Sequence, residues 1–241
     1  MTQSQFVKRI IALTVALIVV APLSAVAAQW QWHRHIERDT RNSLIAHNAI
    51  LDPIPWNRLL DSKVEPSMEW RTVSATGRFD NKAQKLWRKQ PLNGEPGFIM
   101  ITPFITDDGS VLLIARGWIA ADGREPASSV TLSISDEHQE ISARTRILPT
   151  DNSTDPTDLP TGQTNSPRTL LTSSTVDGLF ELLSSNTTQH LTPIPLPELD
   201  SGPHVGYVGQ WIIIGLSAVF VYITVLRRLR TEYQARETKS E

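Results

Sequence analysis

The chain has 241 residues, a formal net charge of −2 and no cysteine. The lack of cysteine excludes disulfides, thiolate metal sites and copper delivery through thiolates, and the balanced charge gives no reason to expect a nucleic-acid partner, because phosphate binding needs a concentrated basic surface. The sequence contains no P-loop, zinc-protease motif or nucleophile elbow, so we expect a protein that is not an enzyme.

The first apolar segment lies near the N-terminus. Residues 10–28 carry no charge and are about as long as a helix that crosses a ~30 Å hydrocarbon core. Lys8 and Arg9 precede this segment and favour a cytoplasmic N-terminus, because basic residues resist translocation. A cleaved signal peptide is the competing interpretation, since Ala25-Val26-Ala27 fits a cleavage site.

The second apolar segment, residues 204–226, is the stronger candidate for a membrane span. Tyr207 and Trp211 stand near its first end and suit the headgroup region, whereas Arg227 and Arg228 follow its last residue and mark the cytoplasmic side. Both termini are therefore expected in the cytoplasm, with the polar middle of the chain on the outer side of the membrane.

The middle of the chain begins with a predicted helix over residues 29–50, which ends before Pro53. Residues that favour β-structure then dominate, and Asp108-Gly109 between two apolar runs predicts a hairpin. Strands are expected at residues 70–79, 97–105, 110–119, 130–134 and 140–148. The predicted fold is an α+β exoplasmic domain dominated by an antiparallel sheet or a small barrel.

Three later segments complete the predicted domain. Residues 149–167 are poor in apolar side chains and rich in Asp, Thr and Pro, so we expect a mobile insertion. Residues 175–183 space apolar side chains as a short helix that docks on the sheet, and residues 190–199 are punctuated by proline and predicted to be extended. The predicted layout is a cytoplasmic N-terminus (1–9), a first transmembrane helix (10–28), an exoplasmic domain (29–203), a second transmembrane helix (204–226) and a cytoplasmic tail (227–241).

Two places in the sequence are candidate sites. His204 stands at the outer end of the second span, where a neutral imidazole could ligate haem iron, since the helix N-terminus disfavours the charged form. The alternative is an interfacial histidine that only caps the helix.

Arg116-Gly117-Trp118 ends an apolar strand, and Arg116 there needs solvent or an acid such as Asp107 or Asp108. The alternative is an edge-strand arginine beside a packed tryptophan.

Several separated motifs resemble one family, the surfeit-locus proteins that assist the assembly of haem-copper cytochrome oxidase. The matching residues extend over almost the whole chain and are Trp30-Gln31, Arg34, Glu69-Trp70-Arg71, Val73, Gly77-Arg78-Phe79, Pro96-Gly97, Thr102-Pro103-Phe104, Asp108-Gly109, Arg116-Gly117-Trp118, Pro203-His204, Tyr207 and Gln210-Trp211. The sequence departs from the family at Ala115, where an asparagine is usual.

The resemblance implies a protein that spans the bacterial plasma membrane twice, with the first span retained. It also implies transient binding of haem a, with His204 as the iron ligand, because bacterial members are associated with haem a through this histidine. Tyr207 and Gln210 follow on the same helix and are expected to contribute to haem binding, and we expect Arg34 to pair with a haem propionate from the opposite helix. The implied role is a chaperone of the respiratory chain that serves cytochrome c oxidase subunits, chiefly the haem-bearing catalytic subunit.

Two other hypotheses remain at this point. The chain could be a structural adaptor that holds an oxidase subunit without touching haem, with sheet edges and Trp118 as its contact surface. It could also be a cleaved domain that only its C-terminal span attaches to the lipid bilayer.

Overall fold

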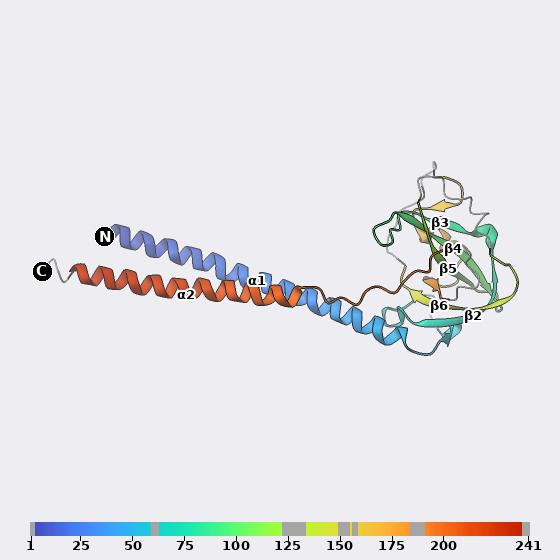
Figure 1. The fold of residues 1–241 in the computed structure, drawn as a ribbon, viewed down its shortest axis with the longest axis horizontal. Helices are drawn as coiled ribbons and strands as arrows, with labels where there is room; N and C mark the ends of the chain where they lie inside the picture. Colours follow the sequence, from blue (N-terminus) through green and yellow to red (C-terminus); the bar gives the residue numbers. More distant parts are fainter. Residues whose placement is uncertain are drawn as a thin grey trace. The chain divides into compact units, whose positions relative to one another are not determined.

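Figure 1 shows the computed structural model of the chain, in which residues 3–58, 63–121, 134–148, 155, 159–183 and 191–237 are described. The chain forms two compact units. One contains Met1–Asn42 and Leu199–Glu241 and is helical, and the other is the β-rich Ser43–Glu198. Two apolar helices and a β-rich domain between them in sequence were both expected.

The helical unit is built from α1, Gln3–Ala49, and α2, His204–Glu237. Helix α1 continues through Pro22, although proline has no N–H to donate. The helix predicted to follow the first apolar segment is confirmed as far as Ala49, and α2 begins at His204, the residue where the second span was predicted to start.

The two helices pack in an antiparallel pair. The rings of Phe6 and Tyr233 stack with their centroids 4.7 Å apart, and the hydroxyls of Thr14 and Tyr222 lie 3.2 Å apart. The residue number on α2 falls as the number on α1 rises, as an antiparallel arrangement requires. Hydroxyl pairs between apolar helices satisfy polar groups where water is scarce.

Large apolar side chains remain exposed along both helices. They include Ile11, Ile18, Leu23 and Val26 on α1, and Ile213, Leu216 and Phe220 on α2. Both helices are long and apolar enough to cross a membrane by length and composition. A core helix of a soluble protein would instead bury such a surface, so the exposed surface is consistent with a membrane span.

The β-rich domain contains short strands and 3₁₀ turns. The strands are β1 (Ile54–Pro55), β2 (Thr72–Phe79), β3 (Lys85–Trp87), β4 (Gly97–Thr106), β5 (Val111–Ala120), β6 (Gln139–Arg146), β7 (Gln163–Thr164) and β8 (Leu179–Leu182). The 3₁₀ turns are Trp56–Arg58, Pro66–Met68, Asn81–Ala83 and Pro167–Ser173.

The strands close into a small barrel, which Figure 1 shows around the labels β2, β4, β5 and β6. The strand order runs β2-β6-β8-β5-β4, and β4 pairs again with β2, so these strands form a closed ring. Closure leaves no free edge within the ring. The expectation of a sheet or small barrel is confirmed, although β5 and β8 are parallel rather than antiparallel.

The barrel interior is apolar. Its core is the cluster Val64, Val73, Ala75, Phe79, Phe104, Leu112, Ile114, Ile134, Ile141, Ala143, Val176, Phe180 and Leu182. On β2 and β6 the core residues alternate along the strand, as side chains on one face of a strand must. Phe79 and Phe104 meet edge to face with centroids 4.9 Å apart and join β2 to β4.

The predicted hairpin is confirmed. β4 and β5 pair antiparallel around Asp108-Gly109, where Gly109 has a φ of 82° and its N–H donates to the Thr106 carbonyl at 2.9 Å. The strands expected at residues 70–79, 97–105, 110–119 and 140–148 are present within a few residues. Residues 130–133 of the remaining predicted strand lie outside the described part of the chain.

The helix predicted over residues 175–183 is wrong. This segment contains β8, which lies between β5 and β6 with all of its side chains buried. A central strand covered on both faces does not alternate apolar and polar residues, so its short apolar run imitates a helical pattern.

The prediction of a mobile insertion over residues 149–167 is wrong for the last of these residues. β7 pairs with β3, and Gln163 and Thr164 are buried. The Thr164 hydroxyl contacts the Ser166 carbonyl at 2.7 Å and the Thr169 hydroxyl at 2.9 Å, so hydrogen bonds order a segment with few apolar side chains. Residues 149–154 and 156–158 of the insertion lie outside the described residues.

Candidate functional site

The start of α2 follows a tight turn. The Gly202 N–H donates to the Asp200 carboxylate at 2.7 Å, and Gly202 has a φ of 65°, in the left-handed region that favours glycine. The Pro203 carbonyl then accepts the first helical hydrogen bond, from the Tyr207 N–H at 3.2 Å. This turn places His204 at the first residue of the helix.

The side chain of His204 is held by Gln31 of α1. Its Nδ1 lies 2.8 Å from the Gln31 Oε1. Because an amide oxygen only accepts, Nδ1 carries the proton in this contact, which leaves a lone pair on Nε2. Nε2 is buried and has no hydrogen-bond partner among the described residues. The imidazole therefore does not cap α2; it has the tautomer of a metal ligand that an outer hydrogen bond orients.

Gly202 leaves room for two nitrogen-bearing side chains. A Cβ atom at Gly202 would lie 2.9 Å from Arg38 Nη1 and 3.3 Å from His204 Nε2. Both nitrogens therefore approach the same point, and a larger residue at position 202 would displace one of them. The local cluster thus consists of Gln31, Arg38, Gly202 and His204.

The other predicted site residues lie outside this cluster. Arg34 donates to Glu37 at 3.1 Å and is half-exposed, and its guanidinium lies 5.8 Å from the centre of the Trp30 ring. Tyr207 and Gln210 are exposed on α2. No hydrogen bond or ion pair in the described part of the chain joins His204 to Arg34, Tyr207 or Gln210.

Sequence reasoning did not assign Gln31, Arg38 or Gly202 to the site. Gln31 and Arg38 are seven residues apart, close to two helical turns, so they lie on one face of α1. That spacing could have paired the two residues. It could not show that the face meets the start of α2.

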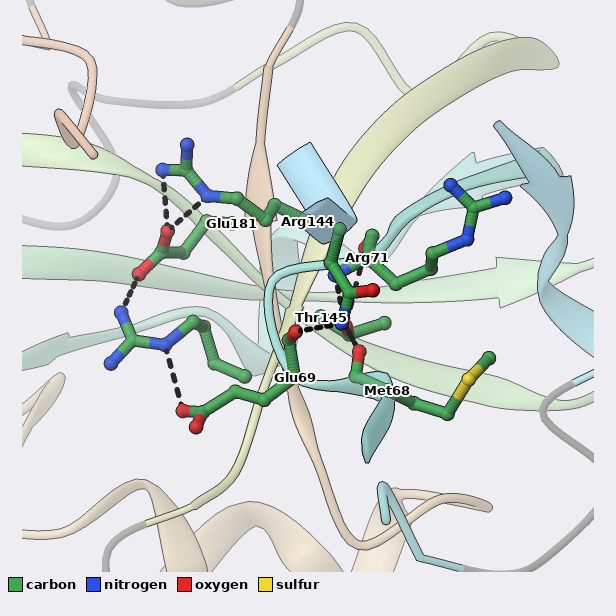
Figure 2. A network of polar contacts seen from close by, with 8 residues as sticks. Met68, Glu69, Arg71, Arg144, Thr145 and Glu181 are labelled. Carbon is green, nitrogen blue, oxygen red and sulfur yellow. Dashed lines mark hydrogen bonds and ion pairs between the residues drawn. The ribbon is translucent and has the colours of Figure 1, made fainter. Parts of the chain in front are cut away.

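The barrel domain has a separate polar network, shown in Figure 2. Arg144 donates to Glu181 at 2.6 and 2.9 Å, and Arg146 joins Glu181 to Glu69. The Thr145 hydroxyl hydrogen-bonds with two backbone carbonyls of the turn before β2, those of Met68 and Arg71. Since every carboxylate in this network is paired, it stabilises the domain rather than presenting a binding site.

The network fixes the Glu69-Trp70-Arg71 turn. Trp70 is 1% exposed and has a φ of 70°, which is unusual for an aromatic residue. The Arg146 guanidinium lies 3.7 Å from the centre of its ring. Asn48, near the end of α1, donates to the Ser67 and Glu69 carbonyls at 2.9 and 2.8 Å. The turn therefore anchors the end of α1 within this unit.

The structure corrects the sequence-based interpretations of Arg116, which placed it in solvent, beside an acid or on an edge strand. β5 lies between β8 and β4, so Arg116 is not on an edge strand. Its side chain is buried and donates to Gln84 at 3.3 Å and Thr102 at 3.5 Å, and burial lowers the pKa of Arg116 to about 10.

Neither proposed acid pairs with Arg116. Asp107 accepts from Thr76 at 2.6 Å and contacts His138 at 2.7 Å, and these contacts hold its pKa below the usual value. Asp108 contacts Thr106 and the Ser110 N–H, which lower its pKa in the same way. Asp108 is therefore satisfied within the hairpin, and Asp107 by Thr76 of β2 and by His138.

Trp118 is not a free contact surface. It is 8% exposed, and its indole N–H donates to the Gln90 carbonyl at 2.6 Å. The contact surface assigned to Trp118 in the adaptor hypothesis is therefore wrong.

Among the described residues, no group of three or more His, Asp or Glu side chains could hold a metal ion.

These features define a class of protein: a closed β-barrel that lies in sequence between two apolar helices, which pair antiparallel, with a partly buried histidine at the start of the second helix. The model of the SURF1 family matches residues 18–216, and the chain belongs to that family.

Individual relatives agree with this assignment. A SURF1-like protein of Mycobacterium tuberculosis is 28% identical over 239 residues, which cover 90% of this chain and 86% of the relative. A SURF1-like protein of Rickettsia conorii is 24% identical and covers 69% of this chain and 73% of its own. The cytochrome oxidase assembly protein SHY1 of Saccharomyces cerevisiae is 36% identical over 78 residues, 32% of this chain and 20% of that protein.

Proposed function

We propose that this protein is a membrane-anchored assembly factor that helps to insert haem a into the catalytic subunit of a haem-copper cytochrome c oxidase, and that it is not an enzyme. Membership of the SURF1 family and the similarity to a yeast protein named for cytochrome oxidase assembly support the oxidase as the client. The two apolar helices support a place in the membrane.

In this proposal both helices span the bacterial plasma membrane, and the barrel lies on the outer side. Lys8 and Arg9 precede the apolar part of α1, and Arg227, Arg228 and Arg230 follow that of α2. Basic residues at these ends favour cytoplasmic termini. His204, at the opposite end of the apolar stretch of α2, then lies near the outer face.

The buried Nε2 of His204 is the observation that carries the haem proposal. Nδ1 contacts Gln31, Nε2 has no hydrogen-bond partner among the described residues, and Gly202, which has no Cβ, lets the imidazole and Arg38 approach the turn closely. These residues fit an axial iron ligand whose outer nitrogen is fixed by a second residue. Haem is cargo here, and a single imidazole ligand permits the release that transfer requires, whereas two strong ligands would retain the cargo.

The test is the haem content of protein purified from cells that make haem a. We expect wild type to copurify with haem and show Soret absorption, and His204→Ala to lose most of it, because the axial ligand is removed. His33→Ala is the matched control, since the His33 Nδ1 contacts the Gln29 carbonyl of its own helix at 2.8 Å. Equal haem content in wild type and His204→Ala would remove His204 from the mechanism. An oxidase subunit that copurifies without any Soret band would favour a structural adaptor instead.

A further inference from the structure

The guanidinium of Arg38 lies beside the candidate iron ligand. Arg38 Nη1 and His204 Nε2 are 2.9 and 3.3 Å from the same point, the Cβ position that Gly202 leaves empty. Arg38 is exposed and takes part in no hydrogen bond or ion pair within the described residues. In the part of the chain that the structure describes, the Arg38 guanidinium therefore has no counter-ion and stands close to His204 Nε2, which has no hydrogen-bond partner.

Arg34, the arginine that the sequence suggested for the same purpose, is engaged elsewhere. Its guanidinium is paired with Glu37 and lies near the Trp30 ring. Arg38 differs because it shares a helix face with Gln31, the residue that holds the imidazole. Of these two arginines, only Arg38 meets the turn that precedes His204.

We propose that Arg38 binds a propionate carboxylate of the haem that His204 ligates, an inference that rests on the proposed function. A porphyrin carries its iron at the centre and its carboxylates at one edge, so a site for it needs a nitrogen ligand and a nearby cation. Arginine suits a carboxylate because its planar fork can donate two parallel hydrogen bonds. The iron and the acidic edge then have separate partners, one on each helix.

The experiment varies the arginine and the carboxylate together. Full-length protein in detergent is titrated with hemin, and separately with hemin dimethyl ester, in which both propionates are neutral. We expect Arg38→Gln to weaken hemin binding about 10- to 100-fold, the usual range for hydrogen bonds to a charged group. Binding of the dimethyl ester by Arg38→Gln should equal that of wild type, because the ester offers no charge to Arg38.

Arg34→Gln is the matched control and should bind hemin as wild type does. The Soret position of the Arg38→Gln complex should also match wild type, because the axial ligand is unchanged. If Arg38→Gln binds hemin as tightly as wild type while His204→Ala does not bind it, Arg38 has no such role and the haem function stands. If His204→Ala also binds hemin normally, the proposed function fails. A loss by Arg38→Gln that is equal for hemin and its ester would also overturn the carboxylate assignment.

Discussion

The hydrogen bond between Gln31 and His204 decides how a single imidazole can act. Without an acceptor at Nδ1 the ring could rotate or change tautomer, and Nε2 would no longer present a lone pair in one direction. The distance of 2.8 Å joins residues from the two helices, so the ligand is oriented only while α1 and α2 remain paired at that level.

Replacement of Gln31 should therefore weaken haem binding without removing the iron ligand. We expect Gln31→Leu to lower hemin affinity about tenfold or more, the lower end of the range for outer partners of metal ligands. Gln29→Leu is the control, because Gln29 is exposed on the same helix. Absorbance titration measures both variants, and equal affinities for the two would show that the Gln31 contact does not orient the ring.

At the scale of elements, the ion network on β6 and β8 stabilises the barrel from its outer side. The side chains of Arg144 and Glu181 are each 5% exposed, and Arg144 also donates to the Ile194 carbonyl at 3.0 Å. The network thus ties β6 to β8 and to the segment that leaves the domain. Removal of one member would leave a buried charge without a partner, which is costly.

We expect Glu181→Gln to destabilise the domain by about 3–5 kcal/mol. Glu37→Gln, which breaks the exposed pair with Arg34, should cost about 1 kcal/mol or less. Urea unfolding of the full chain in detergent, followed by tryptophan fluorescence, compares the two variants. Similar midpoints for both would mean that burial of the network contributes nothing.

Particular elements show how far the sequence predicts this fold. The apolar helices and the β4–β5 hairpin follow from local composition and from Asp108-Gly109. β8 does not, because a buried strand of four residues lacks alternation, and only its neighbours decide that it is a strand. The same holds for the candidate site. His204 could be predicted because it stands at the start of an apolar span, whereas Arg38 could not, because only the pairing of two helices distant in sequence brings it near His204.

At the scale of the whole molecule, the proposed topology can be tested with single cysteines, because the chain has none of its own. We expect Glu95→Cys, on an exposed part of the barrel domain, to react with a membrane-impermeant maleimide in intact spheroplasts. Glu232→Cys, beyond the arginines that follow the apolar part of α2, should react only after permeabilisation. The reverse pattern would place the barrel in the cytoplasm and would contradict the proposed haem relay at the outer face.

The position of β8 also sets an order of events during biosynthesis. β5 and β6 do not pair with each other, and Leu179–Leu182 must enter between them before the ring can close. The ring stays incomplete until nearly all of the domain has left the ribosome, because β8 lies near the end of the domain sequence. A polypeptide that is threaded through a translocation channel must remain unfolded while it passes. In the proposed topology, in which the barrel lies on the outer side, the late position of the closing strand in the sequence is compatible with such a passage.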